Sequence, residues 1–165
     1  ASQVRQDFNC FGGFGQQGYG YNVSNLTGEI KRIMGIDRKH TIIIVGAGNI
    51  GHALTNFPGF AETGFEVKAL FDVNEDLIGT EIKGHPVLDV KDMDEYIREN
   101  QIDIGVIAAR RSAAQEIADR MCAAGIRGIW NFVPLDITTS VPIENVHLSE
   151  SLSTLSYKIE HGLLD

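Results

Sequence analysis

The chain has 165 residues, of which 43% are hydrophobic and 22% charged, with a net charge of −8 at pH 7. This composition is typical of a globular protein and excludes a disordered one. No apolar stretch is long enough to span a bilayer and no secretory leader opens the sequence, so we expect a cytoplasmic protein with no membrane partner. The cysteines, Cys10 and Cys122, lie far apart outside any metal-binding pattern, which predicts neither a disulfide framework nor a metal site.

Charge is divided unevenly along the chain. Residues 1–40 hold five Lys/Arg against three Asp/Glu, whereas the remaining 125 residues hold nine against nineteen. This division fits two parts that have different partners. The sequence opens without a methionine, inside a helical pattern from Ser2 to Phe8, so we expect the chain to be a fragment.

Glycine alternates with aromatic residues from Cys10 to Val23. This pattern predicts a tight β-hairpin or wing, because each glycine in a helix costs about 1 kcal/mol relative to alanine. An amphipathic helix is expected next, capped by Ser24 and closed by Gly35.

A run of β-branched residues, Thr41 to Val45, leads directly into the spacing Gly-x-Gly-x-x-Gly formed by Gly46, Gly48 and Gly51. A strand followed by this spacing is typical of dinucleotide binding. The first glycine permits a sharp exit from the strand, the second lets the backbone approach a pyrophosphate at the helix N-terminus, and the third lets the helix pack closely. In a chain with 18 glycines, the alternative is a tight strand-to-helix turn with another ligand or none.

Asp72 ends a second apolar run 21 positions after Gly51. An acid at this place accepts hydrogen bonds from the adenosine ribose, and the following Val73 and Asn74 supply no cation for a 2′-phosphate. We therefore predict NAD(H) rather than NADP(H) as the cofactor. The predicted contacts are Gly46, Ala47, Gly48, Asn49, Ile50, Gly51 and Asp72.

Apolar runs alternate in type through the rest of the chain. Helices are expected over 91–100 and 113–124, and strands over 102–108, 126–132 and, last, 146–148. This alternation predicts an α/β fold with a Rossmann-type doubly wound parallel sheet. A final apolar stripe from Leu148 to Leu163 predicts a helix that either packs on its own domain or is exchanged with a second copy in a dimer.

The chain resembles the redox-sensing transcriptional repressor family, Rex, over essentially its whole length. Ser2 to Asp7 is similar to the end of that family's recognition helix, Phe11 to Val23 to its glycine-rich wing, and Gly46 to Gly51 to its dinucleotide loop. Three later blocks are also similar to the family: Ala114 to Asp119, Gly128 to Pro134, and Leu155 to Tyr157.

The resemblance implies a homodimeric repressor that senses the NADH/NAD⁺ ratio and releases double-stranded operator DNA when NADH binds. It divides the chain into a partial winged-helix DNA-binding domain over 1–39, an NAD(H)-binding Rossmann domain over 40–147 and an exchanged dimerisation helix over 148–165, and the earlier winged-helix segments are expected to be missing. The DNA contacts that it implies are Ser2, Gln3, Arg5, Gln16, Gly18 and Tyr19.

Two groups at the carboxyl ends of the predicted strands are further candidates for cofactor contacts. Phe132, Val133 and Pro134 are placed to form an apolar wall that disfavours the charged ring of NAD⁺, the alternative being plain core packing. Asn131, directly before them, is a further predicted cofactor contact. Arg110 and Arg111 stand near the place where the family usually has a proline, and they either touch a cofactor phosphate or lie in solvent.

Two other functions remain open on the sequence: the NAD-binding domain of an oxidoreductase, and a CoA-binding domain. Against an enzyme, no acid, base or nucleophile stands out, and each of the five histidines is better interpreted as a structural or solvent-exposed residue. Against CoA, Asp72 is placed for a ribose diol. We therefore predict a regulator without catalytic residues.

Overall fold

The computed structural model describes residues 15–16, 20–21, 23–33, 35 and 38–163. The chain divides into two compact units, Ala1–Lys39 and His40–Asp165. In the first unit, β1 (Gly15–Gln16) pairs antiparallel with β2 (Gly20–Tyr21), and α2 (Val23–Ile33) follows. The paired strands agree with the expected hairpin, whereas the helix begins at Val23, ahead of the expected cap, Ser24.

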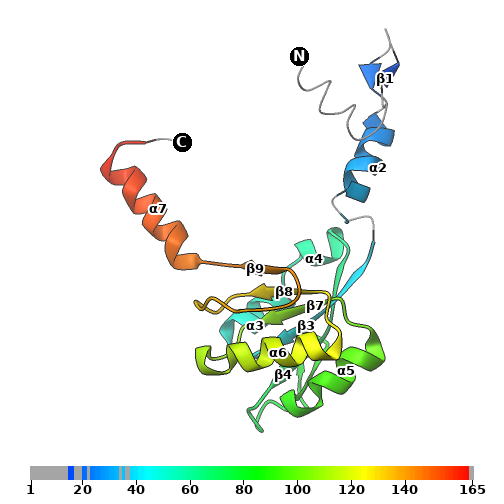
Figure 1. Cartoon of the computed structure of the whole chain (residues 1–165), viewed down its shortest axis with the longest axis vertical. Helices are drawn as coiled ribbons and strands as arrows, with labels where there is room; N and C mark the ends of the chain where they lie inside the picture. The colour runs from blue at the N-terminus through cyan, green and yellow to red at the C-terminus, as the bar shows by residue number, and fades with distance from the viewer. Residues whose placement is uncertain (1–14, 17–19, 22, 34, 36–37, 164–165) are drawn as a thin grey trace. The chain divides into compact units, whose positions relative to one another are not determined.

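The second unit is built on one seven-stranded sheet in the order β5-β6-β4-β3-β7-β8-β9 (Figure 1). All neighbouring strands run parallel except β5, which is antiparallel to β6. The strands are β3 (His40–Val45), β4 (Phe65–Asp72), β5 (Glu81–Ile82), β6 (His85–Asp89), β7 (Ile104–Ile107), β8 (Gly128–Asn131) and β9 (Ile143–Asn145). This arrangement confirms the predicted α/β fold with a doubly wound sheet.

Helices cover both faces of the sheet (Figure 1). The helices on the two faces are α3 (Asn49–Thr55), α4 (Gly59–Glu62), α5 (Met93–Asn100) and α6 (Ala114–Ala124), with short 3₁₀ turns η1 (Val90–Asp92) and η2 (Arg111–Ala113). The last helix, α7 (Leu148–Glu160), extends away from the sheet. One buried cluster joins the sheet to α5 and α6, and a second lies on the opposite face, where Leu54 of α3 and Phe60 of α4 pack against it. The central strand β3 is buried on both sides, which explains its unbroken apolar run.

The chain reverses direction across the sheet between β3 and β7. From β3 it proceeds to β4 and β6 on one side, and from β7 it proceeds to β8 and β9 on the other. Parallel strands that part in this way leave a crevice at their carboxyl ends, and ligands of open α/β sheets bind in that crevice. The glycine loop leaves β3 at this place.

Two elements differ from the sequence predictions. The last strand, expected over 146–148, is β9 at Ile143–Asn145, and Leu148 instead begins α7. The hairpin of β5 and β6 was not predicted, because both strands are short and Pro86 interrupts the apolar pattern. Its turn carries Lys83 and Gly84, both with positive φ (55° and 82°).

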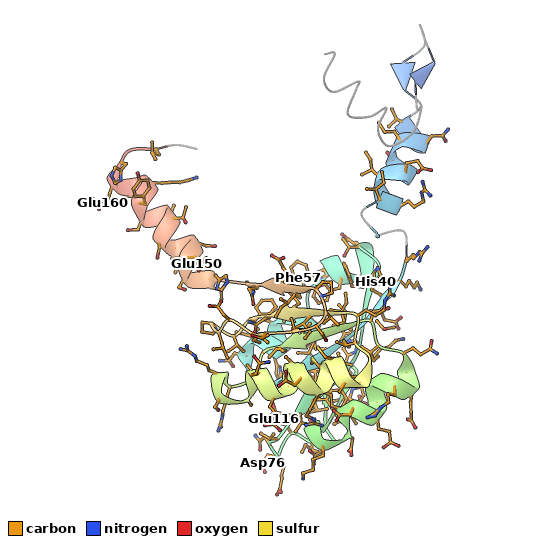
Figure 2. All side chains as sticks on the ribbon, in the orientation of Figure 1. His40, Phe57, Asp76, Glu116, Glu150 and Glu160 are labelled. Atoms are coloured by element: carbon orange, nitrogen blue, oxygen red, sulfur yellow. The ribbon has the colours of Figure 1, made fainter. Side chains whose placement is uncertain are left out.

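The apolar stripe of the last helix, α7, is not buried against the rest of the unit. None of its residues is buried, and Leu152 and Leu155 are 69% and 53% exposed. Figure 2 shows its side chains from Glu150, near the start, to Glu160 at the end. No helix among the described residues has the length and apolar character needed to cross a membrane.

Candidate functional site

A cavity of about 910 Å³ opens at the carboxyl edge of the sheet, at the predicted crevice. Its volume lies within the range of about 300–1,000 Å³ that is usual for small-molecule sites. The glycine loop (Gly46, Gly48) lines one side, Phe71 to Asn74 at the end of β4 another, and Ala108 to Arg110 after β7 a third. Segments far apart in the sequence therefore meet around one space.

The three glycines of the loop do three different things. Gly46 has φ +107°, and a Cβ there would collide with the carbonyl of Ala108. Gly51 is buried, and a Cβ there would collide with the carbonyl of Gly46, so only glycine lets α3 begin this close to the strand. At Gly48 a Cβ would meet nothing within 4 Å. Because Gly48 also lines the cavity, its missing side chain leaves room for a ligand to approach the backbone.

Asp72 ties the end of β4 to the glycine loop. One carboxylate oxygen, Oδ2, accepts a hydrogen bond from the backbone N–H of Ala47 at 2.6 Å. The other, Oδ1, accepts from the N–H groups of Val73 (2.8 Å) and Asn74 (2.9 Å). These three hydrogen bonds fix the orientation of the Asp72 carboxylate. Because a carboxylate offers about four acceptor positions, one remains for a further donor such as a ribose hydroxyl.

The structure brings together some of the predicted cofactor contacts and separates others. Gly46, Gly48 and Asp72 line the cavity, and Ala47 lies directly behind them, bonded to Asp72. Asn49, Ile50 and Gly51 form the first turn of α3 and are not part of the lining.

Asn131, Phe132 and Pro134 also lie outside this lining. The Asn131 side chain is fully buried, and its amide nitrogen lies within hydrogen-bond distance of the Val133 and Leu135 carbonyls and of Asn145 Oδ1. Its Oδ1 in turn accepts from the N–H of Val133. The amide therefore holds the loop after β8 in place, and these three residues remain predictions as cofactor contacts.

Several lining residues could not be predicted from the sequence, because no motif marks them. Leu77 follows β4, Val90 follows β6, and Ser112 and Ile117 come from η2 and α6. Their common signal is position: each stands shortly after a strand or at the start of a helix that faces the crevice. Of the two arginines after β7, Arg110 lines the cavity and Arg111 does not.

The described part of the chain contains no alternative chemical centre. No group of three or more His, Cys, Asp or Glu side chains there is arranged to hold a metal ion. Cys122 is a free, half-buried thiol whose sulfur lies 3.1 Å from Thr139 Oγ1. Burial raises the pKa of Cys122, but hydrogen bonds from Thr139 and Ser140 outweigh this and place the pKa below its ordinary value.

A second, apolar groove of about 760 Å³ lies on the α4 face of the sheet. Phe57, labelled in Figure 2, lines it together with Phe60, Phe65, Trp130 and Ile143. Phe57 is 56% exposed, which is unusual for a phenylalanine beside a core. The groove offers almost no polar groups, so it suits an apolar partner surface.

The doubly wound sheet, the glycine loop at its switch point and the acid at the end of β4 define a Rossmann-type nucleotide-binding domain. In agreement with this class, residues 37–135 match the family described as the CoA binding domain, and they belong to it. The chain as a whole belongs to the Rex family of redox-sensing transcriptional repressors, since it is 52% identical over 164 residues to the Rex repressor of Clostridioides difficile (strain 630). The match covers 98% of this chain and 78% of that repressor.

Two solved structures of a Rex-family repressor, RSP, extend the likeness to three dimensions. RSP in complex with NAD⁺ and operator DNA is 47% identical, with a TM-score of 0.91 over 99% of this chain and 76% of that one. RSP in complex with NADH is 43% identical, with a TM-score of 0.84 over 99% of this chain and 77% of that one. The family membership confirms the predicted resemblance and the class of protein, a transcriptional regulator and not an enzyme.

Proposed function

We propose that this chain senses the NADH/NAD⁺ ratio through the cavity at the end of β3 and couples it to the release of operator DNA. The observation that carries the proposal is the pairing of Gly48, which is open toward the cavity, with Asp72, which is fixed at the cavity wall. These residues fit a dinucleotide, whose diphosphate needs a close approach to the backbone and whose ribose needs an acceptor. The relatives crystallised with NAD⁺ and NADH support the same cofactor.

The choice of NAD(H) over CoA rests on Asp72. A carboxylate at the end of β4 accepts from a ribose with free hydroxyls and repels one that carries a phosphate. CoA carries a 3′-phosphate on its adenosine ribose, and NADP(H) carries a 2′-phosphate. We expect NADH to bind and CoA to bind far more weakly, which intrinsic NADH fluorescence and competition with CoA will test.

Asp72→Ala tests the ribose contact, but the structure adds a complication. Asp72 also holds the Ala47 N–H, so the variant loosens the glycine loop as well as losing the ribose acceptor. The informative comparison is therefore NADH against its 2′-deoxyadenosine analogue on the unaltered protein. If the analogue binds more weakly than NADH, the proposed hydrogen bond between Asp72 and the ribose is supported, and equal affinities contradict it.

The DNA-binding role belongs to residues 1–39. The two-stranded ribbon of β1 and β2 has the form of a short wing, and a relative is crystallised on operator DNA. We assign DNA contacts to Ser2, Gln3, Arg5, Gln16, Gly18 and Tyr19; of these only the backbone of Gln16 falls within the described residues. Arg5 is placed for a phosphate or base-edge contact.

The active form is a homodimer held by α7, in the cytoplasm where operator DNA and the cofactor pool meet. Two observations favour the dimer: an exposed apolar helix on the chain, and an apolar groove on the sheet face of the same chain. Exchange of terminal elements is a low-cost route to twofold dimers. A twofold dimer also predicts a pseudo-palindromic operator.

The switch requires that the two redox forms of the cofactor stabilise different protein conformations. To move a conformational equilibrium from 1:99 to 99:1, a ligand must prefer one state by about 10⁴, or about 5.5 kcal/mol, which two sites in a dimer can share. Phe132, Val133 and Pro134, directly after β8, remain our candidates for the apolar wall that favours the neutral ring of NADH.

A gel-shift titration tests the whole proposal. Full-length protein is bound to a palindromic AT-rich operator duplex, and NADH and NAD⁺ are added separately. NADH should release the DNA at concentrations where NAD⁺ leaves it bound. If both release it equally, or neither does, the redox switch is wrong.

A further inference from the structure

The cavity at the end of β3 contains one cation among its described lining residues. Two lining side chains carry a charge, Asp72 and Arg110. The carboxylate of Asp72 is engaged with three backbone N–H groups. By contrast, the guanidinium of Arg110 makes no ion pair or side-chain hydrogen bond with the residues that the structure describes, so its five donors are available to a ligand.

The fold brings Arg110 to the glycine loop. The N–H of Ala108 donates to the carbonyl of Val45 at 2.8 Å, and the Ala108 carbonyl lies against Gly46. Arg110 follows two residues later in an extended conformation (φ −67°, ψ 144°), directly before η2. Two residues span at most about 7 Å, so Arg110 starts close to the loop, and it lines the same cavity.

Arg111 provides a contrast within the same turn. Both arginines are exposed, but Arg111 lies inside η2 and does not line the cavity. The two neighbouring arginines therefore have the same charge and nearly the same distance along the chain from β7, and only one of them faces the site. From the sequence alone, either arginine could contact a cofactor phosphate or lie in solvent.

We propose that Arg110 binds the diphosphate of the cofactor, an inference that rests on the proposed function. A diphosphate at the glycine loop brings two negative charges into a cavity that already holds the Asp72 carboxylate, in a chain of net charge −8. Arg110 offsets this repulsion and supplies a bidentate donor for phosphate oxygens.

Binding of the diphosphate by Arg110 has a specific effect on redox sensing. NADH and NAD⁺ share the same diphosphate, so Arg110 strengthens both complexes by a similar factor. The ratio of the two affinities is then set elsewhere, by the groups around the nicotinamide. Arg110 thus sets the concentration range of total cofactor over which the sensor operates, and leaves its preference for one redox form unchanged.

The experiment compares Arg110→Gln with the matched control Arg111→Gln in the full-length protein. Affinities for NADH, NAD⁺, ADP-ribose and adenosine are measured by fluorescence and calorimetry at low and high salt. Arg110→Gln should lower the affinities for NADH, NAD⁺ and ADP-ribose by about ten-fold each and leave the affinity for adenosine unchanged. It should also reduce the dependence of the three lowered affinities on salt. Arg111→Gln should leave all four affinities within about two-fold of the unaltered protein. Arg110→Lys should retain part of the affinity that Arg110→Gln loses, because lysine keeps the positive charge but cannot donate in a bidentate way.

Several outcomes overturn the inference. Equal losses for adenosine would place Arg110 on the adenine ring, and unequal losses for NADH and NAD⁺ would place it at the nicotinamide. No loss in Arg110→Gln, while the unaltered protein binds NADH, would make Arg110 a surface residue. An unaltered protein that binds neither NADH nor ADP-ribose would refute the proposed function itself, which is a separate result.

Discussion

At the scale of single residues, the glycine loop separates the requirements of folding from those of binding. Gly46 and Gly51 are needed because a Cβ at either would collide with a backbone carbonyl. Gly48 is needed for another reason, since the backbone φ of −77° suits any residue and the space around it is open. The three positions of one motif therefore respond differently to the same substitution.

We predict that Gly51→Ala lowers the free energy of unfolding by about 1–3 kcal/mol, because backbone must shift to admit the methyl group. Gly48→Ala should change the free energy of unfolding by less than about 0.5 kcal/mol. It should nevertheless lower the affinity for NADH by at least about ten-fold, because its methyl group occupies the space of the ligand. Thermal unfolding and NADH fluorescence measure both effects. A Gly48→Ala variant that binds NADH normally would contradict the assignment of the cavity.

Asp103 gives a prediction about pH. Its carboxylate accepts from the Thr41 N–H at 3.1 Å and from Arg127 Nη1 at 2.7 Å, and His40 Nδ1 lies 3.7 Å away. Burial raises the pKa of Asp103, but the hydrogen bonds from Thr41 and Arg127 and the nearby positive charge outweigh it, so the pKa lies below its ordinary value. Asp103 thereby joins the starts of β3 and β7.

A lowered pKa in the folded state means that this stabilisation is complete above the unfolded-state pKa, about 3.9, and is lost as the pH falls through the folded-state pKa. Unfolding by urea between about pH 7 and pH 2.5 should show a steeper loss of stability for the unaltered protein than for Asp103→Asn. Parallel curves for the two proteins would mean that Asp103 does not couple folding to protonation.

At the scale of elements, α6 shows how the core fixes a helix over the sheet. Met121 is fully buried over β7, and a Cβ on Gly105 beneath it would lie 2.5 Å from the methionine sulfur. Glycine in the strand thus makes room for the longer side chain of the helix. The apolar spacing of α6 and its end at Gly125, with φ +99°, made this helix predictable from sequence.

We predict that Met121→Ala lowers the free energy of unfolding by about 2–5 kcal/mol, because it leaves a cavity between α6 and β7. Glu116→Ala, on the exposed side of the same helix (Figure 2), should change it by less than about 0.5 kcal/mol. Chemical denaturation measures both. Similar losses in the two variants would show that α6 is not anchored through Met121.

The elements that sequence could not predict are the short ones at the sheet edges. β4 was expected to end at Asp72 and does, because a long apolar run bounded by a polar turn leaves little ambiguity. β9 has three residues, Ile143, Glu144 and Asn145, too few for a periodic pattern to emerge. The same holds for the site. The glycine loop and Asp72 are marked by a local motif, whereas Arg110 lies at the same cavity only because of the order of strands in the sheet.

At the scale of the whole molecule, the exposed apolar face of α7 requires a partner. Leu148, Leu152, Leu155 and Ile159 are each more than half exposed, and they share one side of the helix by their spacing. We predict that Leu152→Asp combined with Leu155→Asp converts the dimer to a monomer, as measured by light scattering. The control Thr154→Asp places one such negative charge on another side of the helix and should leave the dimer intact.

An unaltered protein that is monomeric at micromolar concentration would contradict this prediction, as would a leucine variant that remains dimeric. The same leucine variant should also lose operator binding, because a single protomer contacts only one half-site. A monomer that binds the operator as tightly as the dimer would separate DNA binding from assembly.

The hydrogen bond between Asp72 and the Ala47 N–H has a consequence for engineering cofactor preference. In many dinucleotide-binding domains, the obvious route to accepting a phosphorylated ribose is to replace the acid at this position. Here that replacement would also release the Ala47 N–H of the loop that we propose binds the diphosphate. A change of cofactor in this scaffold therefore demands a second substitution that holds the loop, and libraries that vary position 72 alone should return variants that bind neither cofactor well.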